Sequence, residues 1–352
     1  MHGFTLVELM VGVLVALLVG IAAMSTARFY TAPQREGIGT SLAVASATSA
    51  LTAISEDIAQ AGLGFIPTGP NMCGSLNLSR GASSWTLNPF SPVRITRDGD
   101  SDIVDVIYGS EVGGGADVRL AAPSDLKSAQ LASALPVAAG QAVLLAPMPS
   151  ALAAAAANGI CTVRTVTSIS TGVGAVPMTL EMSASGSATH NQVVFSQPTQ
   201  YLIDDRVSIL GRVEWHRFRV VDGNLMLEWP MEGRSAVLMR SVVAFRAQYG
   251  VAGGAGTRPT TITAWNKADA TNWTSVGTTN LSLLRALRLS VLVRSTEPQR
   301  PDSAGDCTAT PTSKPPQLLG AAPTLPTGWE CFYYRTTSVT TPLRNLAWGM
   351  NP

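Results

Sequence analysis

An apolar run opens the chain. From Phe4 to Ala27 the only charged residue is Glu8, and the other positions are uncharged and mostly apolar. As an α-helix at ~1.5 Å per residue, this segment extends ~36 Å, which exceeds the ~30 Å hydrocarbon core of a bilayer. The pattern therefore predicts a transmembrane helix over residues 4–27.

Apolar residues at helical spacing continue beyond this run. They recur three or four residues apart at Leu51, Ile54, Ile58 and Ala61. Gly62 then supplies a helix stop signal. We expect one helix over residues 4–62, kinked or locally broken at Pro33, because proline lacks the N–H that an interior helical residue donates. Its second half should pack an apolar face on a globular head, with Glu56 and Asp57 in solvent.

From residue 63 onward, short stretches alternate apolar and polar residues. Candidate strands cover residues 102–108, 141–145, 162–169, 237–249 and 287–294, and residues 213–230 indicate a hairpin that turns at Asp222-Gly223. The Ala-rich stretch 151–159 predicts a short helix, and the Pro-rich stretch 308–328 predicts a long loop. The predicted fold class is α+β, with a long N-terminal helix packed on a large antiparallel β-rich head at residues 63–352.

Composition excludes several classes of protein. Hydrophobic residues make up 46% of the chain, too many for a mainly disordered protein. The net charge is +1, and no basic block runs along the sequence, so we predict no nucleic-acid partner for this subunit. Charged residues are only 13%, a composition that fits an exported β-rich protein.

Four cysteines stand at Cys73, Cys161, Cys307 and Cys331. None forms C-x-x-C, and with only three histidines in the chain no zinc-ligand cluster is visible. In an exported chain an even number of cysteines indicates disulfides. Of the three possible pairings we favour Cys73–Cys161 with Cys307–Cys331, because each closes the shorter loop. Four buried thiols are the alternative, and would suit a cytosolic chain.

Candidate catalytic and metal-binding chemistry is sparse. Asp98, Asp100 and Asp102 alternate like the start of a calcium loop, but the glycine and glutamate expected at its sixth and twelfth positions are missing. We therefore favour a polar turn over a metal site. The sequence contains no P-loop, nucleophile elbow or zinc-protease motif, and no nucleophile or acid is placed beside His190 or His216. We predict no enzymatic activity and no cofactor.

Glu8 needs a physical reason to lie in an apolar run. A carboxylate near the centre of a membrane helix costs roughly 2.5–3.5 kcal/mol, and less towards the edge. Cleavage after Gly3 would create an α-amine on Phe4, and that cation on a neighbouring chain could pair with Glu8. In a low dielectric such a pair would fix the register between subunits.

The residues from Gly3 to Leu9, GFTLVEL, resemble the class III signal of type IV pilins and pseudopilins. The resemblance implies that a prepilin peptidase cleaves after Gly3 and methylates the new N-terminal Phe4, and that Glu8 guides assembly. Leaders of this family usually carry Lys or Arg, so we interpret residues 1–3 as a leader remnant. The alternatives are a plain membrane anchor or a conventional signal peptide ending near residues 22–27.

Later blocks resemble those of PilW-type minor pilins, in the same order. The blocks are SEDIAQAGLGF at 55–65, FRAQYGV at 245–251, RALRLSVLVRS at 285–295 and YYRTTSVTTPLRN at 333–345. The resemblance implies a single-pass protein of the bacterial inner membrane, with its head in the periplasm, that later enters the pilus fibre. It would help to initiate pilus assembly and lie at or near the tip, in support of twitching motility, adhesion or DNA uptake.

The partners implied are the prepilin peptidase, other minor pilins, the major pilin and the inner-membrane assembly platform. Three alternatives remain open. One is a J-type minor pseudopilin of a type II secretion system, which shares the long helix and large head. The second is a binding module displayed at the pilus tip for adhesion. The third is a signal-anchored periplasmic enzyme.

Overall fold

The computed structural model describes most of the chain. It covers residues 6–65, 73–110, 117–148, 159–171, 178–185, 188–198, 200–253, 261–271, 273–274, 276, 278–302 and 304–349, with the backbone alone at 25–40, 278–279 and 347–349. Gly3, Phe4 and nearly all of the helix expected at 151–159 lie outside these residues.

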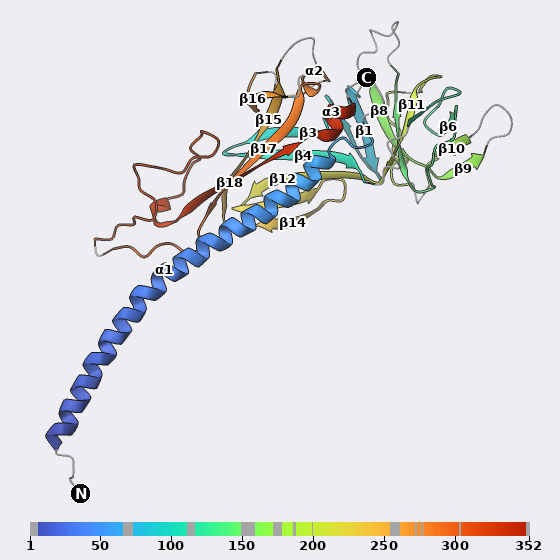
Figure 1. Ribbon diagram of the computed structural model, residues 1–352. Helices are drawn as coiled ribbons and strands as arrows, with labels where there is room; N and C mark the ends of the chain where they lie inside the picture. The colour runs from blue at the N-terminus through green and yellow to red at the C-terminus, as the bar shows by residue number, and fades with distance from the viewer. Residues whose placement is uncertain are drawn as a thin grey trace.

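The first element is one continuous helix, α1, which spans Leu6–Gln60. The backbone stays helical through Pro33, so the expected local break is wrong. A proline removes one interior donor, and the helical turns on both sides retain theirs. Figure 1 shows α1 as a gently curved rod whose first half projects away from the head and whose second half lies along it.

The rest of the described chain is β-rich and forms four sheets. The six-stranded sheet has the order β2(Ser83–Leu87)-β1(Ser75–Arg80)-β8(Ile160–Thr165)-β7(Ala142–Ala146)-β11(Arg206–Gly211)-β5(Asp117–Arg119), and the three-stranded sheet has the order β6(Ser128–Leu131)-β10(Met178–Glu181)-β9(Ser168–Thr171). The five-stranded sheet has the order β14(Arg234–Met239)-β13(Asn224–Trp229)-β12(Val213–Val221)-β4(Ser101–Gly109)-β3(Val93–Asp98). The four-stranded sheet has the order β16(Ile262–Lys267)-β15(Val242–Ala252)-β17(Leu284–Arg294)-β18(Tyr334–Pro342). Short helices α2(Thr278–Leu281), η2(Trp329–Cys331) and α3(Arg344–Gly349) complete the described elements. The long apolar helix and the β-rich head confirm the predicted fold class.

The β12–β13 hairpin turns at Asp222-Gly223, as predicted, and both residues have positive φ, 48° and 71°. Two other expected strands are wrong in their bounds. The stretch 237–249 is two strands, β14 and β15, separated where Ser241 adopts a φ of 61°. The stretch 162–169 belongs to β8 and β9, which lie in different sheets. Neither interruption contains a glycine or a proline that would mark it in the sequence.

Two large apolar cores organise the head, and a third, small cluster packs Leu318 of the Pro-rich loop on Ala244 and Leu292. The larger core joins the second half of α1 to the inner faces of the five-stranded and four-stranded sheets, and the smaller one lies against the three-stranded sheet at the opposite end. Strand β7 separates them: Ala142, Leu144 and Ala146 enter the larger core, while Val143 and Leu145 enter the smaller. Burial on both faces explains why this strand is a continuous apolar run in the sequence.

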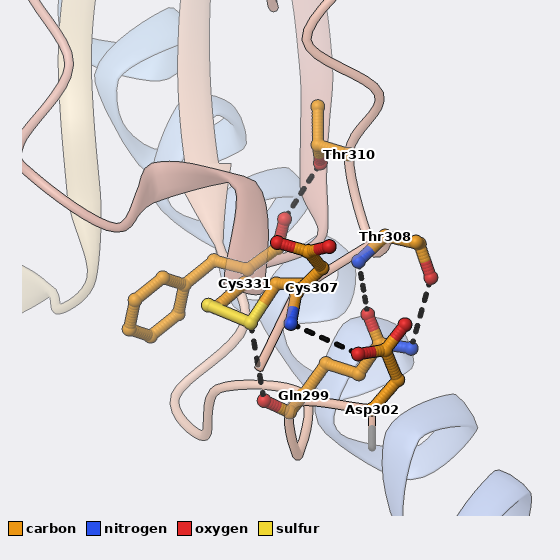
Figure 2. Close-up of a disulfide and its surroundings, with 8 residues drawn as sticks. Gln299, Asp302, Cys307, Thr308, Thr310 and Cys331 are labelled. Atoms are coloured by element: carbon orange, nitrogen blue, oxygen red, sulfur yellow. Dashed lines mark hydrogen bonds between the residues drawn. A yellow bond between two sulfur atoms is a disulfide. The ribbon is translucent and has the colours of Figure 1, made fainter. Parts of the chain in front are cut away.

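The cysteines join in the two pairs favoured from loop length. Cys73 is bonded to Cys161 of β8, with Cα atoms 5.5 Å apart. Cys307 is bonded to Cys331, with Cα atoms 4.8 Å apart. Figure 2 shows the second pair at the base of the Pro-rich loop, where Thr310 also donates a hydrogen bond to the carbonyl of Phe332. The bond thus holds the two ends of that loop together.

Candidate functional site

The first half of α1 is an exposed apolar surface. Residues Leu6–Met24 have a mean hydropathy of 2.6, and none of this segment is buried in the protein. Leu6 and Leu18 expose 78% and 65% of their surface. A contiguous apolar surface of this size marks contact with a membrane or with other proteins. By length and composition the segment can cross a bilayer.

Glu8 lies within this surface, in the first turn of α1, and is exposed. The amide groups at a helix N-terminus favour a nearby carboxylate, so its position is compatible with the helix dipole. Cleavage after Gly3, methylation of Phe4 and the pairing of its amine with Glu8 remain predictions.

The second half of α1 is packed on the head. Its buried side chains are Ala47, Ala50, Leu51, Ile54, Ile58 and Ala61. They contact β17 and β18 of the four-stranded sheet, and α3 adds a further contact. A single helix therefore has an apolar half that is exposed over Leu6–Met24 and a second half that is built into the head.

Polar contacts fix this junction. The Asp57 carboxylate lies 2.7 Å from Nδ1 of His216 on β12, and the Tyr108 hydroxyl on β4 donates to the same carboxylate at 2.9 Å. On the other side of the ring, Nε2 of His216 lies 3.7 Å from Glu214. The expectation that Asp57 is solvated is therefore wrong, whereas Glu56 is exposed.

Two carboxylates surround the His216 imidazole and set its charge. Burial opposes the charged form, but the hydrogen bond to Asp57 and the nearby Glu214 carboxylate outweigh it and raise the pKa of His216 to about 9. The nearby His216 ring in turn lowers the pKa of Glu214. Burial, together with the adjacent Asp57 charge, raises the pKa of Tyr108. At neutral pH the junction holds an imidazolium between two carboxylates.

The C-terminal end of α1 is held by backbone and side-chain bonds. The Asn345 side chain donates to the carbonyl of Gln60 at 3.1 Å, which satisfies a group left unpaired at a helix end. Gly62 N donates to the Ile107 carbonyl at 2.9 Å, and Gly109 N donates to that of Leu63 at 2.9 Å. These bonds set the direction in which α1 leaves the head.

The three alternating aspartates lie in a hairpin turn between β3 and β4. Asp98 and Ser101 are opposite each other, and Gly99 between them has a φ of 57°. Asp102 accepts a bond from Ala247 N at 2.8 Å, and Asp100 accepts one from Thr324 N at 2.8 Å. Across the described part of the chain, no three His, Cys, Asp or Glu side chains are grouped to hold a metal ion.

The histidines differ in their surroundings. His190 is buried beside the Ser79 carbonyl, and burial lowers the pKa of its imidazole. From the sequence, His216 was considered only as a catalytic candidate, and its ion pair with Asp57 was not predicted. The usable signal was Asp57, which stands three residues after Ile54 and four before Ala61, at the edge of the apolar stripe.

Comparisons with known proteins identify a family and a solved structure to which the chain is similar. The family model described as type IV pilus-assembly protein W matches residues 197–345, which include β11 through β18. Among solved structures, the chain is similar to the type IV-like pilin TTHA1219 from Thermus thermophilus, at 11% identity and a TM-score of 0.35, covering 86% of this chain and 96% of that one. No curated protein matches the sequence. The resemblance to the PilW family predicted from the sequence is thus confirmed over residues 197–345.

Proposed function

We propose that the chain is a minor pilin of a type IV pilus, anchored in the bacterial inner membrane by the first half of α1 before it enters the fibre. The main evidence for the proposal is that the two halves of α1 have different surroundings. Residues Leu6–Met24 are fully exposed and, apart from Glu8, uncharged, and the second half of the helix is built into a large β-rich head. The PilW match over residues 197–345 supports the pilus as its destination.

Assembly would proceed through the N-terminus. The prepilin peptidase cleaves after Gly3 and methylates Phe4, and the new amine pairs with Glu8 of a neighbouring pilin. The exposure of Glu8 on the apolar half of α1 leaves it accessible to such a neighbour. The inner-membrane assembly platform, the major pilin and other minor pilins are the remaining partners.

We further propose that the subunit helps to initiate assembly and stays at or near the tip. The head comprises about 290 residues, well above the modal domain size of about 100–150. Close lateral packing of helices along a fibre leaves little room for such a head at every step, and an end position has more. From there the subunit would support twitching motility, adhesion or DNA uptake.

Deletion of the gene tests this function. We expect fewer surface pili and reduced surface-associated movement, both restored by the wild-type gene. A J-type pseudopilin shares this kind of helix and head, although the family match favours the pilus. If deletion leaves pili unchanged and abolishes secretion of exported enzymes, the pseudopilin alternative replaces our proposal.

A further inference from the structure

A cavity of ≈ 270 Å³ lies beside β15, where the head is closed by the Pro-rich loop. The tip of the β3–β4 hairpin contributes Arg97 and Asp102 to its wall. Strand β15 contributes Arg246 and Gln248, and Lys267 stands at the end of β16. The cavity therefore lies where β16 ends and the hairpin tip takes its place along β15.

The hairpin tip replaces a strand at this edge. Beyond the end of β16, the backbone N–H of Ala247 donates to the Asp102 carboxylate at 2.8 Å, and that of Phe245 donates to the Ser101 hydroxyl at 3.2 Å. Side chains thus satisfy strand donors that no neighbouring strand reaches. The open space beside them is the cavity.

The roof is a tight turn of the Pro-rich loop. Leu318 and Ala321 exchange two backbone hydrogen bonds, of 2.8 and 3.1 Å, and both line the cavity. Between them Leu319 has a φ of 49°, a conformation uncommon for a residue with a side chain. Leu319 also lines the cavity. Strained residues of this kind concentrate at functional sites.

The roof is fastened to the head at several points. Leu318 packs with Ala244 and Leu292 of the sheet, and the Thr324 backbone N–H donates to Asp100 of the hairpin at 2.8 Å. At the base of the loop, the Cys307–Cys331 bond is reinforced by Gln299, which exchanges two hydrogen bonds with Thr308 (Figure 2). The cavity is therefore part of the folded head.

Arg97 and Arg246 in the cavity wall differ in how closely they contact carboxylates. Arg97 contacts Asp102 at 3.0 Å and Asp269 at 3.1 Å, so it already has two acidic partners. The Arg246 side chain is only 13% exposed, yet its nearest carboxylate oxygens, on Asp100 and Asp102, lie at 3.9 and 4.0 Å. These distances are beyond hydrogen-bond range.

One further donor at the cavity has capacity for a ligand. Among the described residues, no carboxylate forms an ion pair with the exposed Lys267. The buried Nη1 of Arg97, in contrast, already contacts the Asp102 carboxylate at 3.0 Å.

We propose that this cavity binds a monocarboxylate that carries a short apolar group, either a free acid or the C-terminal residue of a polypeptide. Three cationic and two acidic side chains line the cavity and leave an excess of one positive charge, which matches a monoanion better than a doubly charged phosphate. The planar guanidinium of Arg246 suits a carboxylate in bidentate geometry. Leu319 would contact the apolar group, and the small volume excludes larger ligands.

Saturation-transfer NMR with pentanoate tests the proposal on the full chain in detergent micelles. We expect a signal for pentanoate, none for the neutral pentanamide, and little competition from inorganic phosphate. Arg246→Gln should weaken binding at least ten-fold, and Lys267→Gln should weaken it less. Arg335→Gln is the matched control, because Arg335 is exposed on the same sheet and does not line the cavity.

A competing peptide separates the two sources of the carboxylate. A short peptide that ends in a free leucine carboxylate, but not its amidated form, should displace pentanoate if polypeptide termini are ligands. Failure of both peptides restricts the ligand to free acids. The proposal is overturned if pentanoate does not bind, if phosphate binds more tightly, or if Lys267→Gln and a folded Arg246→Gln variant both bind like the wild type. Circular dichroism melting establishes that the variants are folded.

Discussion

The carboxylate of Asp57 on α1 lies 2.7 Å from the imidazole of His216 on β12, so a charged pair joins the long helix to the head. Both side chains are mostly buried, at 19% and 11% exposure. A pair in such a place stabilises the docked helix only while both charges are present. Removal of either charge leaves the other poorly compensated.

Asp57→Asn should therefore destabilise the protein by about 1–3 kcal/mol, because the His216 imidazolium loses its nearest acceptor charge. Urea denaturation of the full chain in detergent, followed by far-ultraviolet circular dichroism, measures the change. Glu56→Gln is the matched control, since that side chain is exposed, and should alter stability by less than about 0.5 kcal/mol. Equal effects of the two substitutions would contradict the assigned role of Asp57.

Stability should also depend on pH through His216. Its pKa is raised from 6.5 to about 9 in the folded protein, so the folded state retains a proton that the unfolded state has released. The stabilisation is complete below pH 6.5 and is lost as the pH rises through 9, with an order of magnitude of a few kcal/mol. Denaturation midpoints across this range should fall with pH in the wild type.

Asp57→Asn should flatten that decline, because it removes the hydrogen bond that does most to raise the pKa. His190 does not confound the measurement. Burial lowers its pKa, so above pH 6.5 it is neutral in the folded protein, and in the unfolded chain its titration around pH 6.5 can only raise stability slightly with pH, opposite to the predicted decline. A wild-type midpoint that stays level or rises over this window would show that His216 is not charged at the junction.

The two disulfides should differ in their effect on stability. The Cys73–Cys161 pair closes a sequence separation of 88 residues and the Cys307–Cys331 pair one of 24. Because a crosslink restricts the unfolded chain more when it closes a longer loop, replacement of the first pair by serine should cost about 4–5 kcal/mol and of the second about 3.5 kcal/mol.

Thermal denaturation of the two double variants ranks these losses. Limited proteolysis should in addition show new cleavage within residues 308–328 only when Cys307 and Cys331 are replaced. If loss of the Cys307–Cys331 bond destabilises the protein more than loss of the Cys73–Cys161 bond, native contacts around Cys307–Cys331 (Figure 2), and not the entropy of the unfolded chain, determine the effect.

Gly3→Ala should block processing, because the peptidase signal requires the glycine before the cleavage site. Full-length precursor should accumulate in the inner membrane, as seen by mass spectrometry of the N-terminal peptide. His2→Ala, one residue away, is the control and should be processed normally. Normal cleavage of the Gly3→Ala variant would contradict the proposal that a prepilin peptidase processes the N-terminus after Gly3.

Much of this architecture follows from local sequence patterns. The apolar run and the spacing of Leu51, Ile54 and Ile58 predict α1, and Asp222-Gly223 predicts the turn of the β12–β13 hairpin. Both are decided by residues adjacent in the chain. The boundary between β14 and β15 depends on the backbone angle of Ser241, which its side chain does not dictate.

Long-range contacts could not be predicted in the same way. Asp57 and His216 are separated by 159 residues, and only the folded sheet order brings them together. The cavity beside Arg246 likewise combines the β3–β4 hairpin, β16 and the Pro-rich loop.

The helix remained unbroken at Pro33 because the loss of one donor is smaller than the gain from the hydrogen bonds on either side.

The central claim is that the apolar half of α1 carries the subunit into the fibre through Glu8. The most direct measurement is the amount of this protein in sheared, purified pili, determined by quantitative mass spectrometry for the wild type, Glu8→Ala and the Glu56→Ala control. We predict wild-type amounts for Glu56→Ala, and for Glu8→Ala a loss of at least ten-fold with a mature N-terminus at Phe4. Glu8→Ala protein present in the fibres at the wild-type level would contradict the account.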